Sequence, residues 1–121
     1  MHTLLCWFAD DERLSATARQ AIQNGTDVLV SAVSGWEIAT KFRIGKLPSA
    51  APLVEGLPQL LDQNGFQPLS VSLAHAMRSG TLPGPHRDPF DRMLIAQAQL
   101  EQAVLVTNEQ LFEAYGVHRL W

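Results

Sequence analysis

Acidic residues follow two apolar segments and one proline-rich segment of this chain. Glu37 comes shortly after the apolar residues 28–30, Glu109 comes shortly after residues 104–106, and Asp91 follows a proline-rich segment. Two carboxylates 4 Å apart repel each other by about 4 kcal/mol at an effective dielectric near 20, and a shared divalent cation removes that repulsion. The absence of a companion Cys or an ordered His pair favours Mg²⁺ or Mn²⁺ over zinc. Such ions polarise phosphodiester bonds, so the pattern is compatible with metal-dependent phosphodiester chemistry.

The same acids also fit structural roles at helix ends. Ser34 and Glu37 match the capping box S-x-x-E, and Asp88 and Asp91 fall at the cap and third positions of an expected helix. Glu109 suits the first turn of a helix, where the macrodipole favours a negative charge. A cap contributes about 0.5 to 2 kcal/mol, so each acid taken alone is explained without a ligand. Only their common location at strand ends supports a joint function.

Helices and strands are expected to alternate along the chain. Caps, breakers and apolar spacing predict helices over residues 15–24, 34–45, 53–64, 72–78, 88–100 and 109–115. Apolar runs predict strands over residues 28–30, 66–71, 103–107 and 117–121, and residues 3–8 form a further apolar segment. Continuous apolar strands are typical of a parallel sheet with helices on both faces. We therefore expect an α/β fold whose functional crevice lies beyond the carboxyl ends of the strands.

Composition limits the class of protein. With 121 residues, 46% of them apolar, the chain is expected to form one domain over residues 1–121. The single Cys6 cannot form an internal disulfide, and the formal charge of −3 argues against a domain that binds nucleic acid through overall positive charge. No apolar stretch approaches the roughly 18 to 20 residues of a membrane span, so no membrane partner and a cytoplasmic location are expected.

Two motifs are distinctive: H-R-D-P-F-D-R at residues 86–92 and S-G-W-E-I at residues 34–38. They occur in a fixed order with L-L-C-W-F-A-D-D at 4–11, L-V-S at 29–31, G-K-L-P at 45–48, L-V-T at 105–107 and Y-G-V at 115–117. Together these segments resemble the PIN-domain ribonucleases, and specifically the VapC-like toxins of bacterial toxin–antitoxin pairs. The resemblance extends over essentially the whole chain.

The resemblance implies a three-layer α/β/α domain with a parallel sheet that acts as a metal-dependent endoribonuclease. Mg²⁺ or Mn²⁺ would be held by acidic residues, RNA would be the substrate, and a cognate antitoxin and a homodimer would be the partners. Position by position, Glu37 and Asp91 match two acids of the family and Glu109 matches a weaker final acid. These three are the expected catalytic residues, and with Asp88 and Asn108 they are the expected metal ligands.

Substrate contacts are expected from residues that adjoin the acids: Ser34, His86, Arg87 and Thr107. A phosphate is the group that His86 and Arg87 would hold. Arg92 is four residues beyond Asp88 and is expected either near that phosphate or as the ion-pair partner of Asp88. The basic cluster of Lys41, Arg43 and Lys46 fits a solvated helix end better than an RNA contact. Core packing is the favoured role for at least two of Trp7, Phe8 and Phe42.

The chain departs from the family at its beginning. Family members open with a hydrophobic strand that ends in Asp-Thr-His, whereas here His2 falls at the position of that His, and the strand and its Asp are absent. Either the start was placed too late on a longer reading frame, which we favour, or this copy has lost activity. The family strand lies between the strands expected at 28–30 and 103–107, so we expect an empty slot there and reduced stability.

Three hypotheses about function follow. The first is a metal-dependent ribonuclease toxin, and the second is a catalytically inactive module that still binds an antitoxin. The third is an unrelated doubly wound domain that binds Mg²⁺. The third is weakened because no glycine-rich loop follows any expected strand and no strand ends in a phosphorylatable Asp.

Overall fold

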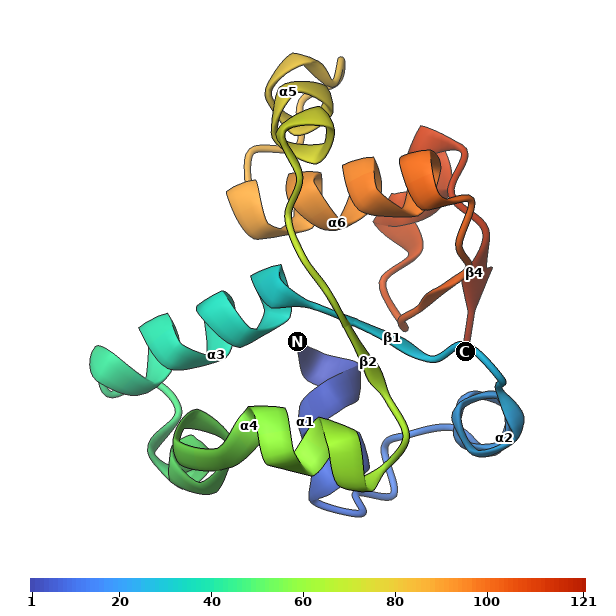
Figure 1. The fold of residues 1–121 in the computed structure, drawn as a ribbon. Coiled ribbons are helices and arrows are strands. Elements are labelled where there is room, and N and C mark those ends of the chain that lie inside the picture. Colours follow the sequence, from blue (N-terminus) through green and yellow to red (C-terminus); the bar gives the residue numbers. More distant parts are fainter.

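The computed structural model describes residues 1–121 and shows helices and short strands in alternation (Figure 1). The helices are α1 (His2–Phe8), α2 (Ala16–Asn24), α3 (Ala32–Arg43), α4 (Ala51–Gln63), α5 (Leu73–Thr81) and α6 (Pro89–Glu101), with 3₁₀ helices η1 (Pro48–Ala50) and η2 (Gln110–Tyr115). The strands are β1 (Leu29–Ser31), β2 (Gln67–Leu69), β3 (Leu105–Val106) and β4 (Arg119–Leu120). The expected alternation is confirmed. None of these helices has the length and apolar composition needed to cross a bilayer.

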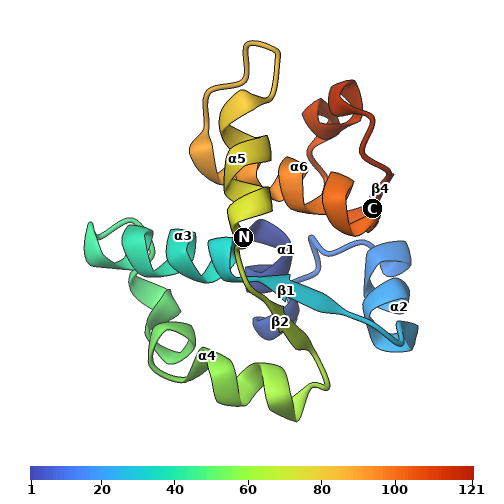
Figure 2. The ribbon, with the colours of Figure 1, turned by 45° about the horizontal axis from the view of Figure 1, so that its top comes forward.

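The strands form two separate parallel pairs instead of one sheet. β1 pairs with β2, with Val30 opposite Pro68, and β3 pairs with β4, with Val106 opposite Leu120. No backbone ladder joins β1 to β3, and the two pairs stand apart in both views (Figure 2). The α/β class with parallel strands is confirmed. So is the expectation that the strands at 28–30 and 103–107 do not pair directly with each other.

A cavity of about 870 Å³ occupies the gap between the two pairs. Its walls are residues 28–31 of the β1 segment and residues 104–107 of the β3 segment, with residues of α1 and α6 covering it. In Figure 1, α6 lies above β1 and α1 lies below it, which gives helices on both faces. We call this space between β1 and β3 the slot.

Local capping explains where two of the helices begin. The Ser15 side chain accepts a hydrogen bond from the Ala18 amide at 3.0 Å and starts α2. The Asp88 carboxylate accepts hydrogen bonds from the amides of Phe90 and Asp91 at 2.9 and 3.1 Å, with Pro89 in the first turn of α6. Proline suits this position because its missing N–H would be unpaired there in any case. Both helix starts are as predicted from the sequence.

The predicted start of α3 is wrong by three residues. Ser31, and not Ser34, is the N-cap, because its Oγ accepts a hydrogen bond from the Val33 amide at 3.0 Å. Ser34 is buried inside the first turns of the helix, so Ser34 and Glu37 do not form a capping box. The burial of Glu37 therefore has no explanation in helix capping.

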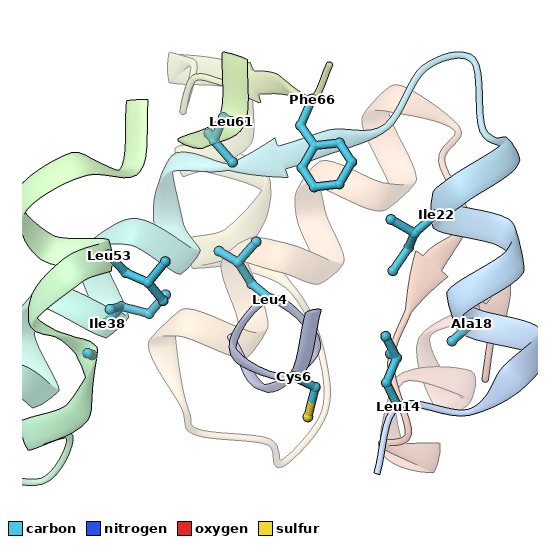
Figure 3. Close-up of a cluster of buried hydrophobic side chains, with 10 residues drawn as sticks. Leu4, Cys6, Leu14, Ala18, Ile22, Ile38, Leu53, Leu61 and Phe66 are labelled. Atoms are coloured by element: carbon cyan, nitrogen blue, oxygen red, sulfur yellow. The ribbon is translucent and has the colours of Figure 1, made fainter. Parts of the chain in front are cut away.

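The hydrophobic core is divided in two by the slot. Ten buried residues between positions 4 and 66 form the larger cluster, around Leu4, Ile38 and Phe66 (Figure 3). Trp7, Phe8 and Phe42 are partly buried against it, which confirms their expected packing role. A smaller cluster of five, centred on the fully buried Ile95, joins α6 to η2 and the C-terminal segment. Residues of both clusters line the slot, Leu4, Ile22 and Phe66 from the larger one and Ala98 and Phe112 from the smaller one.

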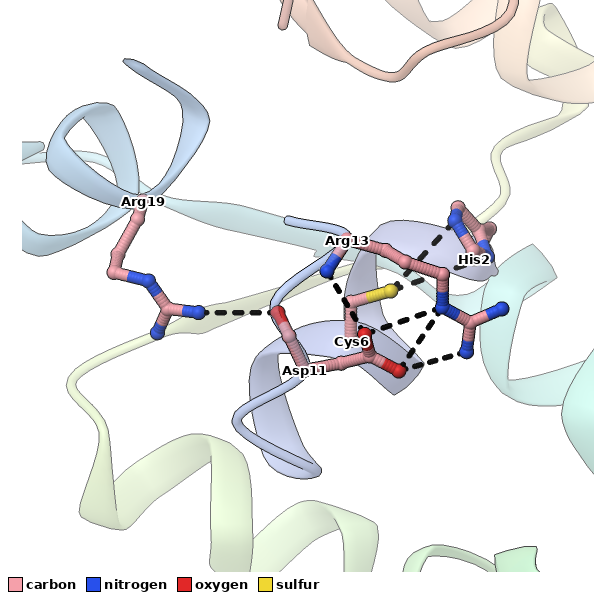
Figure 4. Close-up of polar contacts among 5 residues, drawn as sticks. All are labelled: His2, Cys6, Asp11, Arg13 and Arg19. Carbon is pink, nitrogen blue, oxygen red and sulfur yellow. Dashed lines mark hydrogen bonds and ion pairs between the residues drawn. The ribbon is translucent and has the colours of Figure 1, made fainter. Parts of the chain in front are cut away.

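The link between α1 and α2 is held by surface ion pairs (Figure 4). The Arg13 guanidinium donates to both carboxylate oxygens of Asp11, with Nη2 2.7 Å from Oδ2. Hydrogen bonds from Arg13 lower the pKa of Asp11 to about 2. Arg19 bonds the Asp10 carboxylate and the Asp11 carbonyl oxygen.

Candidate functional site

The first acid of the site is Glu37, which lies in the second turn of α3 just beyond the carboxyl end of β1. Only 7% of the surface of Glu37 is accessible to solvent. The Lys41 ammonium, one turn further along, lies 2.6 Å from Oε2 of Glu37. A buried carboxylate needs such a partner because the loss of hydration destabilises its charge.

The second acid is Asp91, in the first turn of α6, with a half-buried side chain. Nε2 of His86 lies 2.8 Å from Oδ2 of Asp91. Burial raises the pKa of Asp91, the hydrogen bond with His86 opposes this, and the charges of Asp88 and Glu37 raise it further. Glu37 and Asp91 are carried by α3 and α6, which contact each other. We call Glu37 and Asp91 the acidic pair.

Aromatic contact fixes the two helices that carry the acidic pair. The ring centroids of Trp36 and Phe90 are 4.7 Å apart in an edge-to-face arrangement. Each ring belongs to the residue directly before one of the acids. An edge-to-face contact contributes about 0.5 to 1.5 kcal/mol beyond its buried area. The start of α6 is thus held against α3, and the two acids with it.

The proline loop, residues 82–88, is held in place by Arg92. Its guanidinium donates to the carbonyl oxygens of Leu82, of His86 at 2.9 Å and of Ser79 at 3.3 Å. The interpretation of Arg92 as an ion-pair partner of Asp88 is therefore wrong, because Asp88 uses its carboxylate to cap α6. Arg92 positions His86 against Asp91 by fixing the backbone of the loop that carries it.

A buried chain of polar groups, not anticipated from the sequence as a unit, lies next to the site. Ser31 donates to Oε1 of Gln97, and the Gln97 amide nitrogen lies 3.3 Å from Nδ1 of His75. The Ser72 amide donates to the same Nδ1, and Nε2 of His75 faces Glu101 at 3.4 Å. Nδ1 thus serves as an acceptor and Nε2 carries the proton. Gln97 and His75 are 3% and 4% exposed, so these bonds satisfy groups that water cannot reach.

The structure does not bring the other predicted ligands to the acidic pair. Glu109 and Asn108 are exposed, and Glu109 bonds only through its amide, which donates to Thr107 Oγ1 at 3.1 Å. Nowhere in the chain are three His, Cys, Asp or Glu side chains grouped so that they could hold one metal ion. Thr107 and Ser34 line the slot, as Asp91 does.

A second cavity, lined by basic side chains, adjoins His86, the partner of Asp91. A cavity of about 500 Å³ is lined by His86, Arg87, Arg92, Gly80, Gly84 and Pro85 and contains no carboxylate. Arg87 is exposed and forms no hydrogen bond or ion pair, so its guanidinium is free to meet an anion. The arginines of this cavity could meet the negative charge of a phosphodiester directly, whereas the acidic pair could do so only through a cation bound between them.

Comparison with known proteins identifies the family of the chain. The PIN domain family matches residues 3–117. Ribonuclease VapC22 of Mycobacterium tuberculosis (strain ATCC 25618 / H37Rv) is 31% identical over 117 residues, which cover 94% of this chain and 87% of that relative. Ribonuclease VapC16 of the same organism is 46% identical over 48 residues, which cover 40% of this chain and 34% of that relative.

Proposed function

Because the chain belongs to the PIN-domain family, we propose that it is a metal-dependent ribonuclease and the toxin of a bacterial toxin–antitoxin pair. The observation that carries this proposal is the acidic pair. Glu37 is buried and has no capping role. The pKa of Asp91 is raised by burial and by the charges of Asp88 and Glu37. One divalent ion can stabilise the charges of two carboxylates at once, so the acidic pair is a candidate cation-binding site.

The donor chemistry of the pair fits Mg²⁺ or Mn²⁺. Magnesium is commonly bound through one or two carboxylates, with water and substrate phosphate oxygens completing its shell. Glu37 and Asp91 would hold the ion, and Asp88, Asn108 and Glu109 remain proposed contributors that the structure keeps outside the pair. When bound, the ion polarises the phosphodiester and offsets the charge that develops in the transition state.

The chain's own residues supply the rest of the chemistry. His86 presents the N–H of Nε2 to Asp91, because a carboxylate can only accept, so the imidazole holds a proton beside the reacting phosphate. Arg87 and the cavity around it would bind a flanking phosphate of the RNA, and Ser34 and Thr107 would contact substrate from the slot side. Lys41 forms an ion pair with the Glu37 carboxylate and offsets its buried charge.

Partners are proposed on the same basis. A VapC-like toxin implies a cognate antitoxin and RNA as substrate. We propose that this chain is a homodimer and that it meets both partners in the cytoplasm. Leu73 and Met77, one turn apart on α5, are 79% and 62% exposed, the highest exposures among the large apolar side chains. Exposed apolar patches mark protein interfaces, so this face of α5 supports a protein partner.

Cleavage of single-stranded RNA tests the function. We expect the chain to cut a labelled RNA in Mn²⁺ and to stop when the ion is chelated. Asp91→Asn keeps the size of the side chain and removes its charge, so cleavage should fall by more than about 100-fold while the fold is retained. Asp62→Asn, an exposed acid on α4, is the matched control and should cut normally.

The alternative is an inactive module that binds an antitoxin. It is favoured by the contacts of Lys41 and His86, which already satisfy both acids, and by the absence of a third clustered acid. A folded chain that binds an antitoxin but leaves RNA intact in Mn²⁺ would establish this alternative. Cleavage that persists without metal, or undiminished in Asp91→Asn, would refute the proposed site.

A further inference from the structure

Trp36 is the only aromatic residue among the large hydrophobic side chains that the fold leaves exposed, and 56% of its surface is accessible. It directly precedes the buried Glu37, and its ring partner Phe90 directly precedes Asp91. Because consecutive Cα atoms are about 3.8 Å apart, the indole reaches the surface beside the acidic pair. Neither the core nor the chemistry of the pair accounts for this exposed indole surface.

At least one face of the indole is free to receive a flat partner. The Trp36 and Phe90 rings meet edge to face, with an interplanar angle of 69°, so Phe90 covers at most one face of the indole. On α3, the neighbours of Trp36 on the same helix face are Ala32, four residues before it, and Ala39, three residues after it. Both alanines are exposed and too small to cover an indole. The contact with Phe90 also fixes the ring in advance, which lowers the entropy cost of stacking on it.

Cations without an ion-pair partner occur on both segments that meet at this ring. Arg43 lies seven residues after Trp36, two turns along the same face of α3, and Arg87 lies three residues before Phe90. Both arginines are exposed and neither forms an ion pair. Single-stranded nucleic acids are bound by this combination, with cations for the backbone and aromatic rings for the bases. The position of Arg43 on the Trp36 face therefore favours an RNA contact over the solvated helix end expected from the sequence.

We propose that the exposed face of Trp36 is a stacking site for one unpaired nucleobase of the RNA, next to the phosphodiester that reaches the acidic pair. Every base has a π face, so the site accepts all four bases. A base inside a duplex is covered on both faces by its neighbours, so the site selects a segment whose base can leave the stack. The inference rests on the proposed function, because the acidic pair determines which phosphodiester lies beside the ring.

Two RNA probes that differ by a single base test the proposal. One is a labelled hexamer of abasic ribonucleotides, and the other is the same hexamer with one adenine. Their affinities are measured by fluorescence anisotropy in EDTA at low salt, where metal-dependent cleavage cannot occur and phosphate contacts are strong. We expect the adenine to raise the affinity of the parent chain by about 5- to 100-fold. In Trp36→Leu this gain should fall below about 2-fold, while the abasic hexamer should bind as it does to the parent.

Three further variants separate stacking from packing and from charge. Phe90→Leu removes the same ring contact between α3 and α6 but leaves the indole in place, so it should keep most of the adenine gain. Arg43→Gln should weaken the binding of both hexamers by the same factor, because a phosphate contact does not depend on the base. Val54→Ala, at an exposed apolar residue of α4, is the matched control and should bind both hexamers as the parent does. The adenine hexamer should also quench tryptophan emission in the parent and not in Trp36→Leu.

Several results would overturn the stacking site. They are an adenine gain that persists in Trp36→Leu, a parent that binds neither hexamer or binds both equally, and a dimer that dissociates in Trp36→Leu, since the indole would then be covered by a second copy of the chain. Cleavage of intact RNA in Mn²⁺ keeps this inference apart from the proposed function. A parent that shows the adenine gain but never cuts RNA would refute the ribonuclease alone, and a parent that cuts RNA without the gain would refute the stacking site alone.

Discussion

The rings of Trp36 and Phe90 meet edge to face with centroids 4.7 Å apart, and each precedes one acid of the pair, Glu37 or Asp91. The contact joins α3 to α6 across the mouth of the site. Because neither Glu37 nor Asp91 contacts the other through a hydrogen bond or ion pair, their relative position depends on the packing of the helices that carry them.

Removal of this contact should loosen the metal site more than the fold. In Trp36→Ala we expect Mn²⁺ affinity to fall by about 3- to 10-fold, the equivalent of one aromatic contact. Trp36→Phe retains an edge-to-face pair and should stay within about 2-fold of the parent. Calorimetric titration of both variants with Mn²⁺ checks this, and equal affinities in Trp36→Ala and the parent would show that the ring contact does not position the acids.

Arg92 should be a stability residue and Arg87 should not. Arg92→Gln removes donors to three carbonyl groups, and hydrogen bonds from charged groups contribute about 1.5 to 3 kcal/mol each, without full additivity. We expect a loss of about 2 to 4 kcal/mol in the free energy of unfolding, measured by urea titration. Arg87→Gln, in an exposed residue with no partner, should change this free energy by less than about 0.5 kcal/mol. Comparable effects of the two substitutions would show that the hydrogen bonds of Arg92 do not stabilise the proline loop.

The buried polar chain predicts an asymmetry between two histidines. His75→Ala leaves the Ser72 amide without its acceptor and a cavity beside Gln97, so unfolding should be easier by about 2 to 3 kcal/mol. The exposed His118 is the control, and His118→Ala should stay within about 0.5 kcal/mol of the parent. His75→Asn, whose side-chain oxygen can accept from the Ser72 amide, should recover part of the loss. Chemical denaturation curves of the three variants measure these changes in unfolding free energy. Equal unfolding free energies of the two alanine variants would contradict the structural role given to His75.

The Asp11–Arg13 pair should make the stability of the fold decrease at low pH. The pKa of Asp11 is lowered to about 2 in the folded protein by hydrogen bonds from Arg13, from an ordinary value of 3.8. A lowered pKa means that the folded state favours the carboxylate, so the stabilisation is complete above pH 3.8 and is lost as the pH falls towards 2.

The melting temperature of the parent minus that of Asp11→Asn should therefore decline between pH 5 and 2, a range that brackets the two values. Because the pair lies at the surface, added salt should shrink the difference. Arg13→Gln should show the same profile. A difference that is independent of pH, or that grows towards pH 2, would show that the pair does not stabilise the fold.

Local signals in the sequence predicted the elements, and contacts between distant residues decided the details. Ser15 and the Asp88–Pro89 step cap helices through their own neighbours, so their effect is visible in the sequence. Ser34 was misassigned because Ser31, at the end of a strand, competes for the same role and wins by bonding the Val33 amide. The partners of Arg92 lie as far back as Ser79, and backbone carbonyl groups have no sequence signature.

The site was predictable only in part for the same reason. The order of the motifs selects Glu37 and Asp91 as candidates, but the position of Glu109 relative to them depends on how the two strand pairs are spaced. Gln97 offered a usable signal, since a lone amide among the buried residues of α6 requires partners. The place of the slot, between the segments expected at 28–30 and 103–107, was predicted from the resemblance alone.

Binding of Mn²⁺ tests the central claim most directly, since the function proposed here depends on one ion shared by Glu37 and Asp91. The parent, Glu37→Gln, Asp91→Asn and the exposed control Glu55→Gln are titrated with Mn²⁺, and binding is followed by calorimetry and by loss of the free-ion paramagnetic resonance signal. We expect one ion per chain for the parent and for Glu55→Gln, and a loss of affinity greater than about 100-fold in each of the other two. Affinity that is unchanged in either Glu37→Gln or Asp91→Asn would contradict the shared site.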